Sequence, residues 1–488
     1  MSSRDGPSRA GVLEPDICVV GAGSGGLSVA AAAAAVGVSV VLIERSRMGG
    51  DCLNSGCVPS KALIAAAAHA SAIRQASAFG ISAGEPVVDF PAVMRHVRDV
   101  IAGIAPFDSV ERFEGLGVRV LAEEARFLDS QTLAAGPHLI RARRFVLATG
   151  SSPRVPDFPG LEAVPFLTNE TLFDLDVLPS HLLILGGGPI GLEMAQAFRR
   201  LGSAVTVVDA GGALKREDPD LSAIVLSALR AEGVDLREHT AAEAVSMATG
   251  DRRGEETLTL QVRSPSGEAQ VSASHLLVAV GRRPTVEALC LEAGGIDHGP
   301  SGIVVGRDLR TSNARVYAIG DVAGGPQFTH LANHHAGLVV RAILFRLPVR
   351  QTPDLVPRVT YTAPELGQVG LTAAEAGARG IDARVLTWPY ADNDRARTER
   401  RTEGLLKMVV AGDGRLLGAG VAGAKAGELT NLFSLALAQR LTVRDLASFI
   451  SPYPTYAEIG KRAATTYYAP YAKRSIVRAA VRLLSRLG

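Results

Sequence analysis

A glycine-rich turn that occurs twice, about 165 residues apart, places the strongest constraint on the fold. The first copy reads GAGSGG at residues 21–26, and the second reads GGGPIG at residues 186–191. A short apolar run precedes each turn, a helical stretch follows it, and another apolar run comes next. This order predicts a parallel strand–helix–strand unit at each place. The chain is therefore expected to contain two copies of one nucleotide-binding unit.

An acidic residue, Glu44 or Asp209, closes the second apolar run of each copy, at the same offset from the last glycine of its turn. In such units the glycines let the backbone approach a pyrophosphate, and the acid accepts hydrogen bonds from ribose hydroxyls. A carboxylate at position 209 favours NADH because it repels the 2′-phosphate of NADPH, although Lys215 and Arg216 follow closely and would soften that preference. The glycines expected to hold the two dinucleotides are Gly21, Gly23 and Gly26, then Gly186, Gly188 and Gly191.

The chain has four cysteines, too few for a disulfide framework. Two of them, Cys52 and Cys57, lie five residues apart in the glycine-flanked segment 49–61. On a regular helix this spacing is a rise of about 7.5 Å, so a bridge needs a distorted turn, which Gly56 permits. A strained bridge is easily reduced, which favours a redox-active pair. Metal binding is the alternative interpretation, but no second Cys or His pair lies nearby in the sequence.

Charge and composition argue against several classes of function. Net charge is +2 and no basic run is interleaved with aromatics, so no nucleic-acid partner is expected. The polar residues 1–14 lack the apolar core of a signal peptide. The apolar stretch 27–43 is typical of a buried helix that runs into a buried strand rather than of a membrane span. The expected location is the cytoplasm.

Two dinucleotide fingerprints with a Cys-x-x-x-x-Cys pair between them resemble the class I pyridine nucleotide–disulfide oxidoreductases. That family includes glutathione reductase, dihydrolipoyl dehydrogenase and mercuric reductase. The resemblance extends from about residue 16 to residue 471. Further matching segments are ATG at 148–150, GRRP at 281–284, YAIGD at 317–321, YTAPE at 361–365 and VGLT at 369–372.

The resemblance implies a homodimeric enzyme that passes electrons from NADH or NADPH, with NADH favoured, through bound FAD to a redox disulfide. Cys57 would be the thiol beside the flavin, and Cys52 the thiol that faces the substrate. Lys61 and Glu193 match a pair beside the flavin, and a helix that starts near Thr329 would point its N-terminus at the flavin. The residues expected to bind the two cofactors are the six glycines and two acids above, together with Lys61, Gly150, Glu193, Gly281 and Asp321.

The predicted fold class is α/β, with two Rossmann-like domains and an α+β dimerisation domain at the C-terminal end. A length of 488 residues agrees with several domains. The expected divisions are a flexible extension at 1–14, an FAD-binding domain at 15–155 and 276–350, an NAD(P)-binding domain at 156–275, a dimerisation domain at 354–471 and a basic helix at 472–488.

The sequence departs from the family pattern at Tyr453. Disulfide-reducing members carry His-Pro-Thr-x-x-Glu here, supplied by the other subunit, and this chain reads YPTYAE, which makes Tyr453 and Glu458 the remaining catalytic candidates. Tyrosine has a pKa of about 10, against about 6.5 for histidine, and is a poor base at neutral pH. Mercuric reductase has tyrosine at this place, which favours that branch. Neither its N-terminal Cys-x-x-Cys domain nor its C-terminal cysteine pair occurs in the sequence.

The expected substrate is accordingly a metal ion, a small disulfide or another small molecule, with dihydrolipoyl dehydrogenase-type turnover as the alternative to metal-ion reduction. A packing role for Tyr453 at the subunit interface also stays open. The C-terminal stretch 474–488 places arginine at every fourth position, 474, 478, 482 and 486, with apolar residues between them. Such a helix either docks on its own domain or makes peripheral membrane contact, in which case the protein would be a membrane-surface electron-transfer or redox-sensing module.

Overall fold

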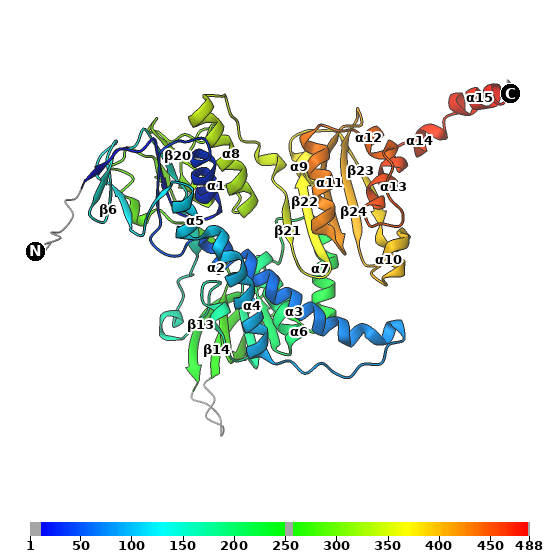
Figure 1. Ribbon diagram of the computed structural model, residues 1–488. Helices are drawn as coiled ribbons and strands as arrows, with labels where there is room; N and C mark the ends of the chain where they lie inside the picture. Colours follow the sequence, from blue (N-terminus) through cyan, green and yellow to red (C-terminus); the bar gives the residue numbers. More distant parts are fainter. Residues whose placement is uncertain (1–10, 249–256, 487–488) are drawn as a thin grey trace, which may run out of the picture.

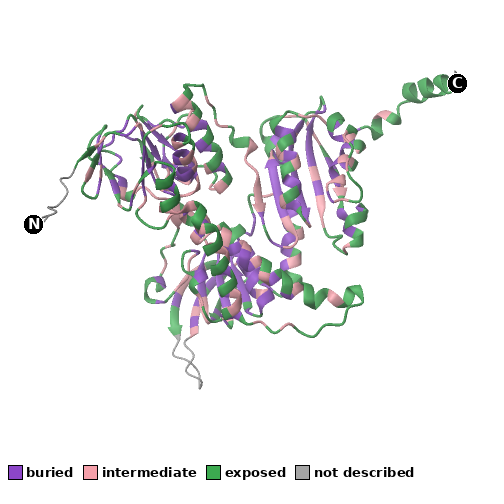
Figure 2. Ribbon diagram, in the orientation of Figure 1, coloured by how far each residue is buried: buried purple, intermediate pink, exposed green. Residues whose placement is uncertain are grey.

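The structure is a computed structural model that describes residues 11–248 and 257–486. Figure 1 shows that these residues form three bodies, each built around a central sheet: one with α1, α8 and β20, one below it with the green strands β13 and β14, and a yellow-to-orange one beside them with α11 and β22. Buried residues concentrate in the sheets and on the inner faces of the helices, whereas the outer helix faces are exposed (Figure 2). The chain therefore folds around several separate cores.

The first sheet has five parallel strands in the order β20-β8-β2-β3-β4. Strands β2 and β3 are apolar and buried along their whole length because both faces of a parallel sheet are covered. Helices α1 and α8 pack against each other beside this sheet. The bounds are β2 (Ile17–Val20), α1 (Ser24–Ala34), β3 (Val40–Ile43), β4 (Arg119–Leu121), β8 (Arg144–Leu147), β20 (Val316–Ala318) and α8 (Thr329–Phe345).

The second sheet has four parallel strands in the order β12-β11-β10-β16, and the chain also forms a three-stranded antiparallel sheet, β13-β14-β15, between β12 and β16. The register of the parallel sheet repeats that of the first, with Leu185 opposite Val208 just as Val20 is opposite Ile43. The bounds are β10 (His181–Leu185), α6 (Pro189–Leu201), β11 (Ala204–Val208), α7 (Pro219–Ala231), β12 (Asp235–Arg237), β13 (Ala241–Ala248), β14 (Thr257–Ser264), β15 (Gly267–Ala273) and β16 (His275–Val278).

Both chain connections between the two parallel sheets run through a two-stranded ribbon made of β9 (Ser151–Pro153) and β17 (Arg282–Pro284). The boundary expected at residue 276 differs from the structure, because 275–278 forms β16 and pairs with β10. The apolar run therefore belongs to the second sheet, and the chain leaves that sheet only after Val278. A division at residue 276 therefore falls inside a strand.

The third sheet is antiparallel, in the order β21-β22-β25-β24-β23, and helix α11 packs against β22 and β25. Its core includes Tyr390, Phe433 and Ile459. The bounds are β21 (Arg358–Thr360), β22 (Glu365–Gly370), α9 (Ala373–Ala378), β23 (Ala383–Pro389), α10 (Asp394–Thr398), β24 (Leu405–Ala411), β25 (Leu416–Gly423), α11 (Ala426–Ala438), α12 (Val443–Ser448) and α13 (Glu458–Thr466).

The N-terminal part of the described chain is more ordered than expected. Val12 and Leu13 form strand β1, which pairs in parallel with β7 (His138–Ile140) in a small sheet with β5 (Ala125–Phe127) and β6 (Leu133–Ala135). The stretch 1–14 is thus not a uniform flexible extension, because the backbone of Val12 and Leu13 is hydrogen-bonded to β7 in a sheet. Residues 1–10 lie outside the described part of the chain.

At the other end, the tail contains two short helices, α14 (Ala469–Ala472) and α15 (Ser475–Leu484). Figure 1 shows α15 projecting away from the rest of the molecule, and none of its residues is buried. Residues 487 and 488 of the expected helix lie outside the described part. Among the described residues, no helix combines the length and the apolar character needed to cross a membrane.

Candidate active site

The two glycine turns have the same backbone geometry. Gly21 and Gly186 have φ angles of +102° and +110°, which side chains rarely adopt. A Cβ on Gly26 would lie 1.9 Å from the carbonyl oxygen of Gly21, and one on Gly191 would lie 2.0 Å from that of Gly186. These four glycines are therefore required by the turn itself and by the close packing of helix on strand.

The middle glycine of each turn has a different reason to be glycine. Gly23 and Gly188 have φ angles of −78° with extended ψ, a conformation open to any residue, and a Cβ on either would meet no protein atom within 4 Å. Each also immediately precedes a helix, α1 or α6, whose first N–H groups face this side. Both turns therefore leave room for an anion to approach the backbone, which fits a dinucleotide pyrophosphate.

The two acids are held in matching ways. Glu44 accepts hydrogen bonds from the N–H groups of Ala22 (2.7 Å) and Ser46 (2.8 Å). Asp209 accepts them from Gly187 (2.7 Å) and Gly211 (2.8 Å). Each carboxylate is thus fixed at the C-terminal end of its strand beside its own glycine turn. This is the place from which an acid can accept from ribose hydroxyls.

The cysteine segment is attached directly to the first glycine turn. The N–H of Gly49 donates to the carbonyl of Ala22 over 3.0 Å, and a Cβ on Gly50 would lie 2.8 Å from the Cα of Gly23. The chain then forms a short helix, α2 (Gly50–Asn54), and a long one, α3 (Cys57–Gln75). Because of this attachment, the cysteines lie beside the site that fits the first dinucleotide.

Cys52 and Cys57 are free thiols in the structure, the first half-buried and the second exposed. Cys52 donates a hydrogen bond to Cys57, which lowers the pKa of the Cys57 thiol to about 6 and raises that of Cys52. The Thr329 hydroxyl, 3.5 Å from the Cys57 sulfur, and the Lys61 charge also lower the Cys57 pKa. Cys57 is the first residue of α3, where a helix N-terminus favours a thiolate. The pair is set as one thiol and one thiolate.

Lys61 and Glu193, expected as a pair, do lie together. The Lys61 ammonium is 2.8 Å from Glu193, whose side chain is only 5% exposed. The other carboxylate oxygen of Glu193 accepts from the N–H of Tyr361 over 2.9 Å, and the Lys61 ammonium lies 4.5 Å from the centre of the Tyr361 ring. The sequence did not single out Tyr361 as a site residue, although it lies in a segment that matched the family.

Asp321 follows strand β20 of the first sheet, and the hydroxyl of Ser151 on β9 donates to its carboxylate over 2.6 Å. Burial raises the pKa of this carboxyl group. Gly150 and Gly281, at the two ends of the ribbon, have φ angles of +69° and +121°, and a Cβ on either would meet no protein atom within 4 Å. The positive φ angles favour glycine at both positions. The choice of glycine at Gly150 and Gly281 is therefore explained by the backbone, without a bound ligand.

The structure does not bring Tyr453 and Glu458 to the cysteines of the same chain, because α13 and α2 lie in different bodies (Figure 1). Nor are they partners of each other. The Tyr453 hydroxyl donates to Asp394 over 3.0 Å, which raises the tyrosine pKa, while Glu458 accepts from Arg462 one helical turn later over 2.9 Å. No acid was predicted from the sequence as the partner of Tyr453, and Asp394 was not among the candidate residues.

Comparison with known proteins agrees with this geometry. The model of the pyridine nucleotide-disulphide oxidoreductases matches residues 15–336, and that of the family's dimerisation domain matches 356–464. The chain belongs to this family. It is therefore a flavoprotein oxidoreductase with two nucleotide-binding domains and a dimerisation domain, in a family that depends on FAD and NAD(P)H.

Individual relatives cover nearly the whole chain. A mercuric reductase of Streptomyces lividans is 38% identical over 94% of this chain and 98% of its own length. A dihydrolipoyl dehydrogenase of Bacillus subtilis is 33% identical over 93% and 96%. The solved HOCl-induced flavoprotein disulfide reductase RclA of Escherichia coli is 29% identical, covers 92% of this chain and 99% of its own, and has a TM-score of 0.80.

Proposed function

We propose that this protein carries two electrons from NADH, through FAD, to a disulfide formed by Cys52 and Cys57. The observation that carries the proposal is the place of the cysteine pair, on a segment attached to the first glycine turn through the Gly49 N–H and the Ala22 carbonyl, with Cys57 at the N-terminus of α3. A hydride supplies two electrons and one proton, so reduction of a disulfide by NADH breaks the S–S bond and leaves one thiol and one thiolate. The lowered pKa of Cys57 and the raised pKa of Cys52 fit that product. FAD, when bound, supplies the step that converts a hydride into an electron pair for the disulfide.

The chain's own residues have separate tasks in this scheme. The turn at Gly188 and the acid Asp209 hold the nicotinamide nucleotide, and the turn at Gly23 holds FAD. Lys61, fixed by the buried Glu193, places a positive charge beside the thiol pair and favours the thiolate. Dimerisation would bring Tyr453 of a second copy to the pair. These roles are proposed from the two glycine turns with their acids and from the Lys61–Glu193 ion pair.

We further propose that the acceptor is a soft divalent metal ion such as Hg²⁺. One thiol and one thiolate can give it two electrons, reform the disulfide and release one proton, without any protein base. Thiol–disulfide turnover does need a base, and the bond to Asp394 raises the pKa of Tyr453, which makes it a poor one. The mercuric reductase relatives support the same choice.

Steady-state assays with Hg²⁺, dihydrolipoamide and glutathione disulfide test this choice side by side. We expect the highest kcat/KM with the metal ion, and a rise of about 10-fold or more in dihydrolipoamide turnover in Tyr453→His, because histidine restores a base. Tyr453→Phe serves as the control and should leave thiol–disulfide turnover low. Wild-type dihydrolipoamide turnover above that with Hg²⁺ would contradict the proposal.

NADH is the proposed donor because Asp209 is fixed beside its turn and repels a 2′-phosphate. Lys215 and Arg216, which could accept such a phosphate, are exposed and follow Asp209 by six and seven residues. The ratio of kcat/KM for NADH to that for NADPH, measured in the same assays, should exceed one.

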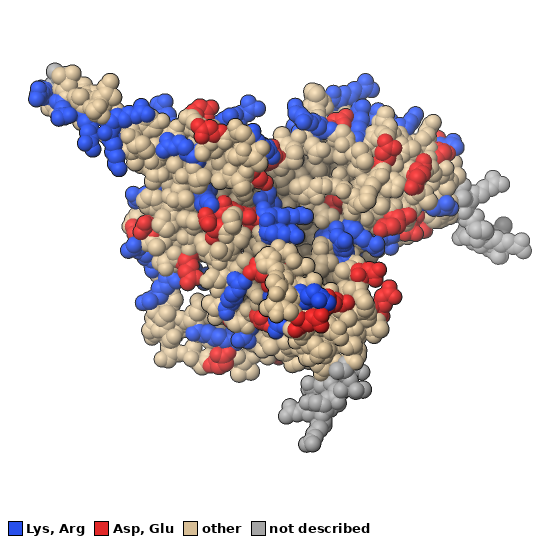
Figure 3. Space-filling model, turned by 180° about the vertical axis from the view of Figure 1, so that it is seen from behind, with Lys and Arg blue, Asp and Glu red and all other residues tan. Residues whose placement is uncertain are grey.

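A membrane-surface role is a second candidate, favoured by the exposed helix α15. Ile476, Val481 and Leu484 on this helix are 75%, 59% and 63% exposed. After Glu458 the sequence has seven Lys or Arg residues and no Asp or Glu, and Figure 3 shows the projecting tail lined with basic side chains. An apolar face flanked by cations suits an anionic lipid surface, at about 1 kcal/mol per cation.

Co-sedimentation with vesicles tests this role, using vesicles of phosphatidylcholine alone and vesicles that also contain phosphatidylserine. We expect the full chain to bind the anionic vesicles, and a chain that ends at residue 473 to lose that binding. An Arg478→Gln, Arg482→Gln variant should bind more weakly and become less sensitive to salt. Equal sedimentation of the full and shortened chains would contradict a membrane role for the tail.

A further inference from the structure

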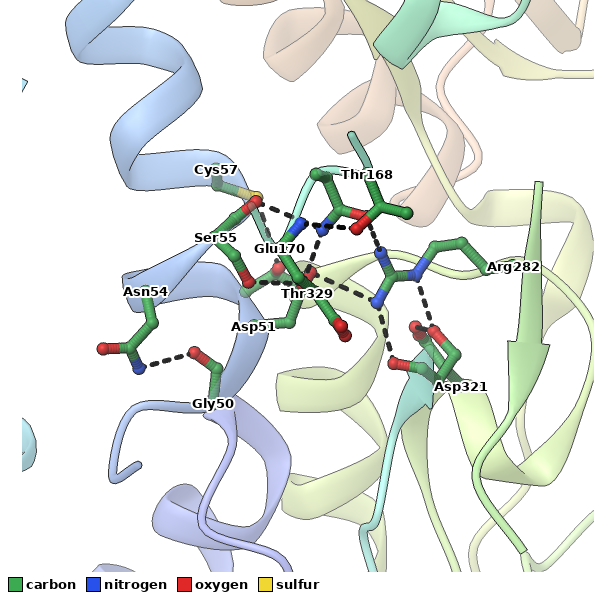
Figure 4. A network of polar contacts seen from close by, with 12 residues as sticks. Gly50, Asp51, Asn54, Ser55, Cys57, Thr168, Glu170, Arg282, Asp321 and Thr329 are labelled. Atoms are coloured by element: carbon green, nitrogen blue, oxygen red, sulfur yellow. Dashed lines mark hydrogen bonds and ion pairs between the residues drawn. The ribbon is translucent and has the colours of Figure 1, made fainter. Parts of the chain in front are cut away.

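A network of polar side chains ties the cysteine segment to the ribbon between the two parallel sheets (Figure 4). Asp51, the residue before Cys52, lies at its centre. One oxygen of the Asp51 carboxylate accepts from Asn169 (2.9 Å) and from the Ser55 hydroxyl (2.9 Å). The other oxygen lies 3.4 Å from the Arg282 guanidinium. The helix α2, a single turn that could not persist alone, is thus braced from outside.

Arg282 is held where it meets this carboxylate. Its side chain is 11% exposed and lies on β17 of the ribbon. It donates to the hydroxyl of Ser151 over 2.7 Å and to the carbonyl of the same residue over 2.8 Å. A third bond reaches the amide oxygen of Asn169 over 3.3 Å. Neutral groups therefore fix the position of the guanidinium without neutralising it. Its positive charge acts on the two nearby carboxylates, Asp51 and Asp321 (Figure 4).

Asp51 is an unfavourable neighbour for a thiolate. Its negative charge raises the pKa of both Cys52 and Cys57, whereas Lys61 lowers that of Cys57. Without a counter-charge, the carboxylate that braces α2 would work against the thiolate at the start of α3. The titratable and charged groups around the pair are Asp51 on α2, Lys61 on α3, Glu193 on α6, Arg282 on β17, Asp321 after β20, His330 on α8 and Tyr361 after β21.

We propose that Arg282 is the counter-charge of Asp51: by pairing with that carboxylate beside the cysteine segment, it allows Asp51 and Asn169 to brace α2 while Cys57 remains a thiolate. Arg282 is in this sense a positioning residue that acts through Asp51. The inference rests on the proposed function only in taking Cys57 as the reactive thiolate. It also assigns a role to the Gly281–Pro284 segment, because this segment links the second sheet to the charge balance of the cysteine pair.

Alkylation of Cys57 by iodoacetamide tests the inference without NADH or any acceptor. A thiolate attacks the reagent, an S–C bond forms and iodide leaves, so the rate follows the thiolate fraction. The FAD-loaded protein is used in a Cys52→Ser background, and the labelled peptide is quantified by mass spectrometry across the pH range in which the thiol titrates. We expect Arg282→Gln to move the pH midpoint up by about 0.5 to 1 unit, and Asp51→Asn to move it down by a similar amount.

Opposite shifts distinguish a charge role from a structural one, since damage to the brace would move both variants in the same direction. Arg282→Lys keeps the charge and should restore the parent midpoint, and the Asp51→Asn, Arg282→Gln combination should return close to it. Asn169→Ala, which removes an uncharged contact to the same carboxylate, is the matched control and should shift the midpoint by far less than Arg282→Gln.

Shifts of the same sign, or unchanged midpoints in Arg282→Gln and Asp51→Asn, would overturn the inference. If Arg282→Gln does not fold, Asp51→Asn decides alone, and a midpoint that stays or rises overturns it. Failure of the proposed electron route would be seen separately, as lost NADH-dependent turnover in a protein whose alkylation profile still shifts as described.

Discussion

Replacing Cys57 with serine should lower the NADH-dependent reduction of Hg²⁺, the proposed acceptor, by on the order of 10³-fold or more. Serine cannot form the disulfide and has no accessible anion at neutral pH, so the thiolate of the pair is lost. Cys52→Ser should be equally inactive, because a disulfide needs both sulfurs. The two losses should not add in the double variant, since the cysteines act as one unit.

The matched control for these variants is reduction of ferricyanide, which takes electrons without the cysteine pair. NADH–ferricyanide turnover should stay within a few-fold of wild type in both variants, because neither glycine turn nor Asp209 is altered. Stopped-flow and steady-state rates measured on the same preparations check both parts. Substantial acceptor turnover in Cys57→Ser would show that electrons leave by another route.

Lys61→Met should lower the free energy of unfolding by about 2 to 3 kcal/mol. The change leaves the Glu193 carboxylate, 5% exposed, without its cation and with only the Tyr361 N–H as a partner. The Lys61 side chain is 37% exposed, so water partly screens the pair and the expected loss is smaller than the loss of about 3 to 5 kcal/mol for a fully buried broken pair. Denaturant unfolding of the FAD-loaded protein measures it.

A second readout separates this role from packing alone. Because the Lys61 charge lowers the Cys57 pKa, Lys61→Met should also raise the pH above which the thiolate forms. The combined Lys61→Met, Glu193→Gln variant should recover most of the stability but not the thiolate, since it removes the stranded charge without restoring the cation. Recovery of neither property, or of both, would contradict the account of this pair.

The geometry of the two glycine turns and their acids could be predicted closely from the sequence, because its determinants are local. The turn, the helix start and the acid at the strand end lie within one short segment of the chain, and the same offset occurs twice. The structure repeats even the hydrogen bonds of Glu44 and Asp209 in the two copies. Glycine, with its special backbone freedom, marks such turns directly in the sequence.

The surroundings of the cysteines could not be predicted in this way, because they come from segments far apart in the chain. Asp51 meets Arg282 and Asn169, which belong to two other stretches of the sequence. Their meeting depends on how the ribbon packs against α2, for which no periodicity or spacing rule exists. Thr329 was expected at a helix start but not as a partner of the Cys57 sulfur.

The partner of Tyr453 also comes from a distant segment of the chain and could not be predicted from the sequence. The family motif made Tyr453 and Glu458 joint candidates, and in the structure Glu458 is the first residue of α13 and pairs with Arg462 on the same helix. Tyr453 precedes that helix and turns to Asp394 on α10 instead. Local helix geometry decided which acid was available, and sequence spacing alone could not show that α10 lies within reach.

The absorbance of the FAD-loaded protein after anaerobic addition of one equivalent of NADH shows directly whether Cys57 is the thiolate beside the flavin. We expect a long-wavelength thiolate–flavin band in the wild type, the same band in Cys52→Ser even before NADH is added, and its absence in Cys57→Ser. In the wild type the band should be full well above pH 6 and fade as the pH falls through about 6, where Cys57 gains its proton. No band in the wild type, or one that persists in Cys57→Ser, would show that Cys57 is not the thiolate beside the flavin.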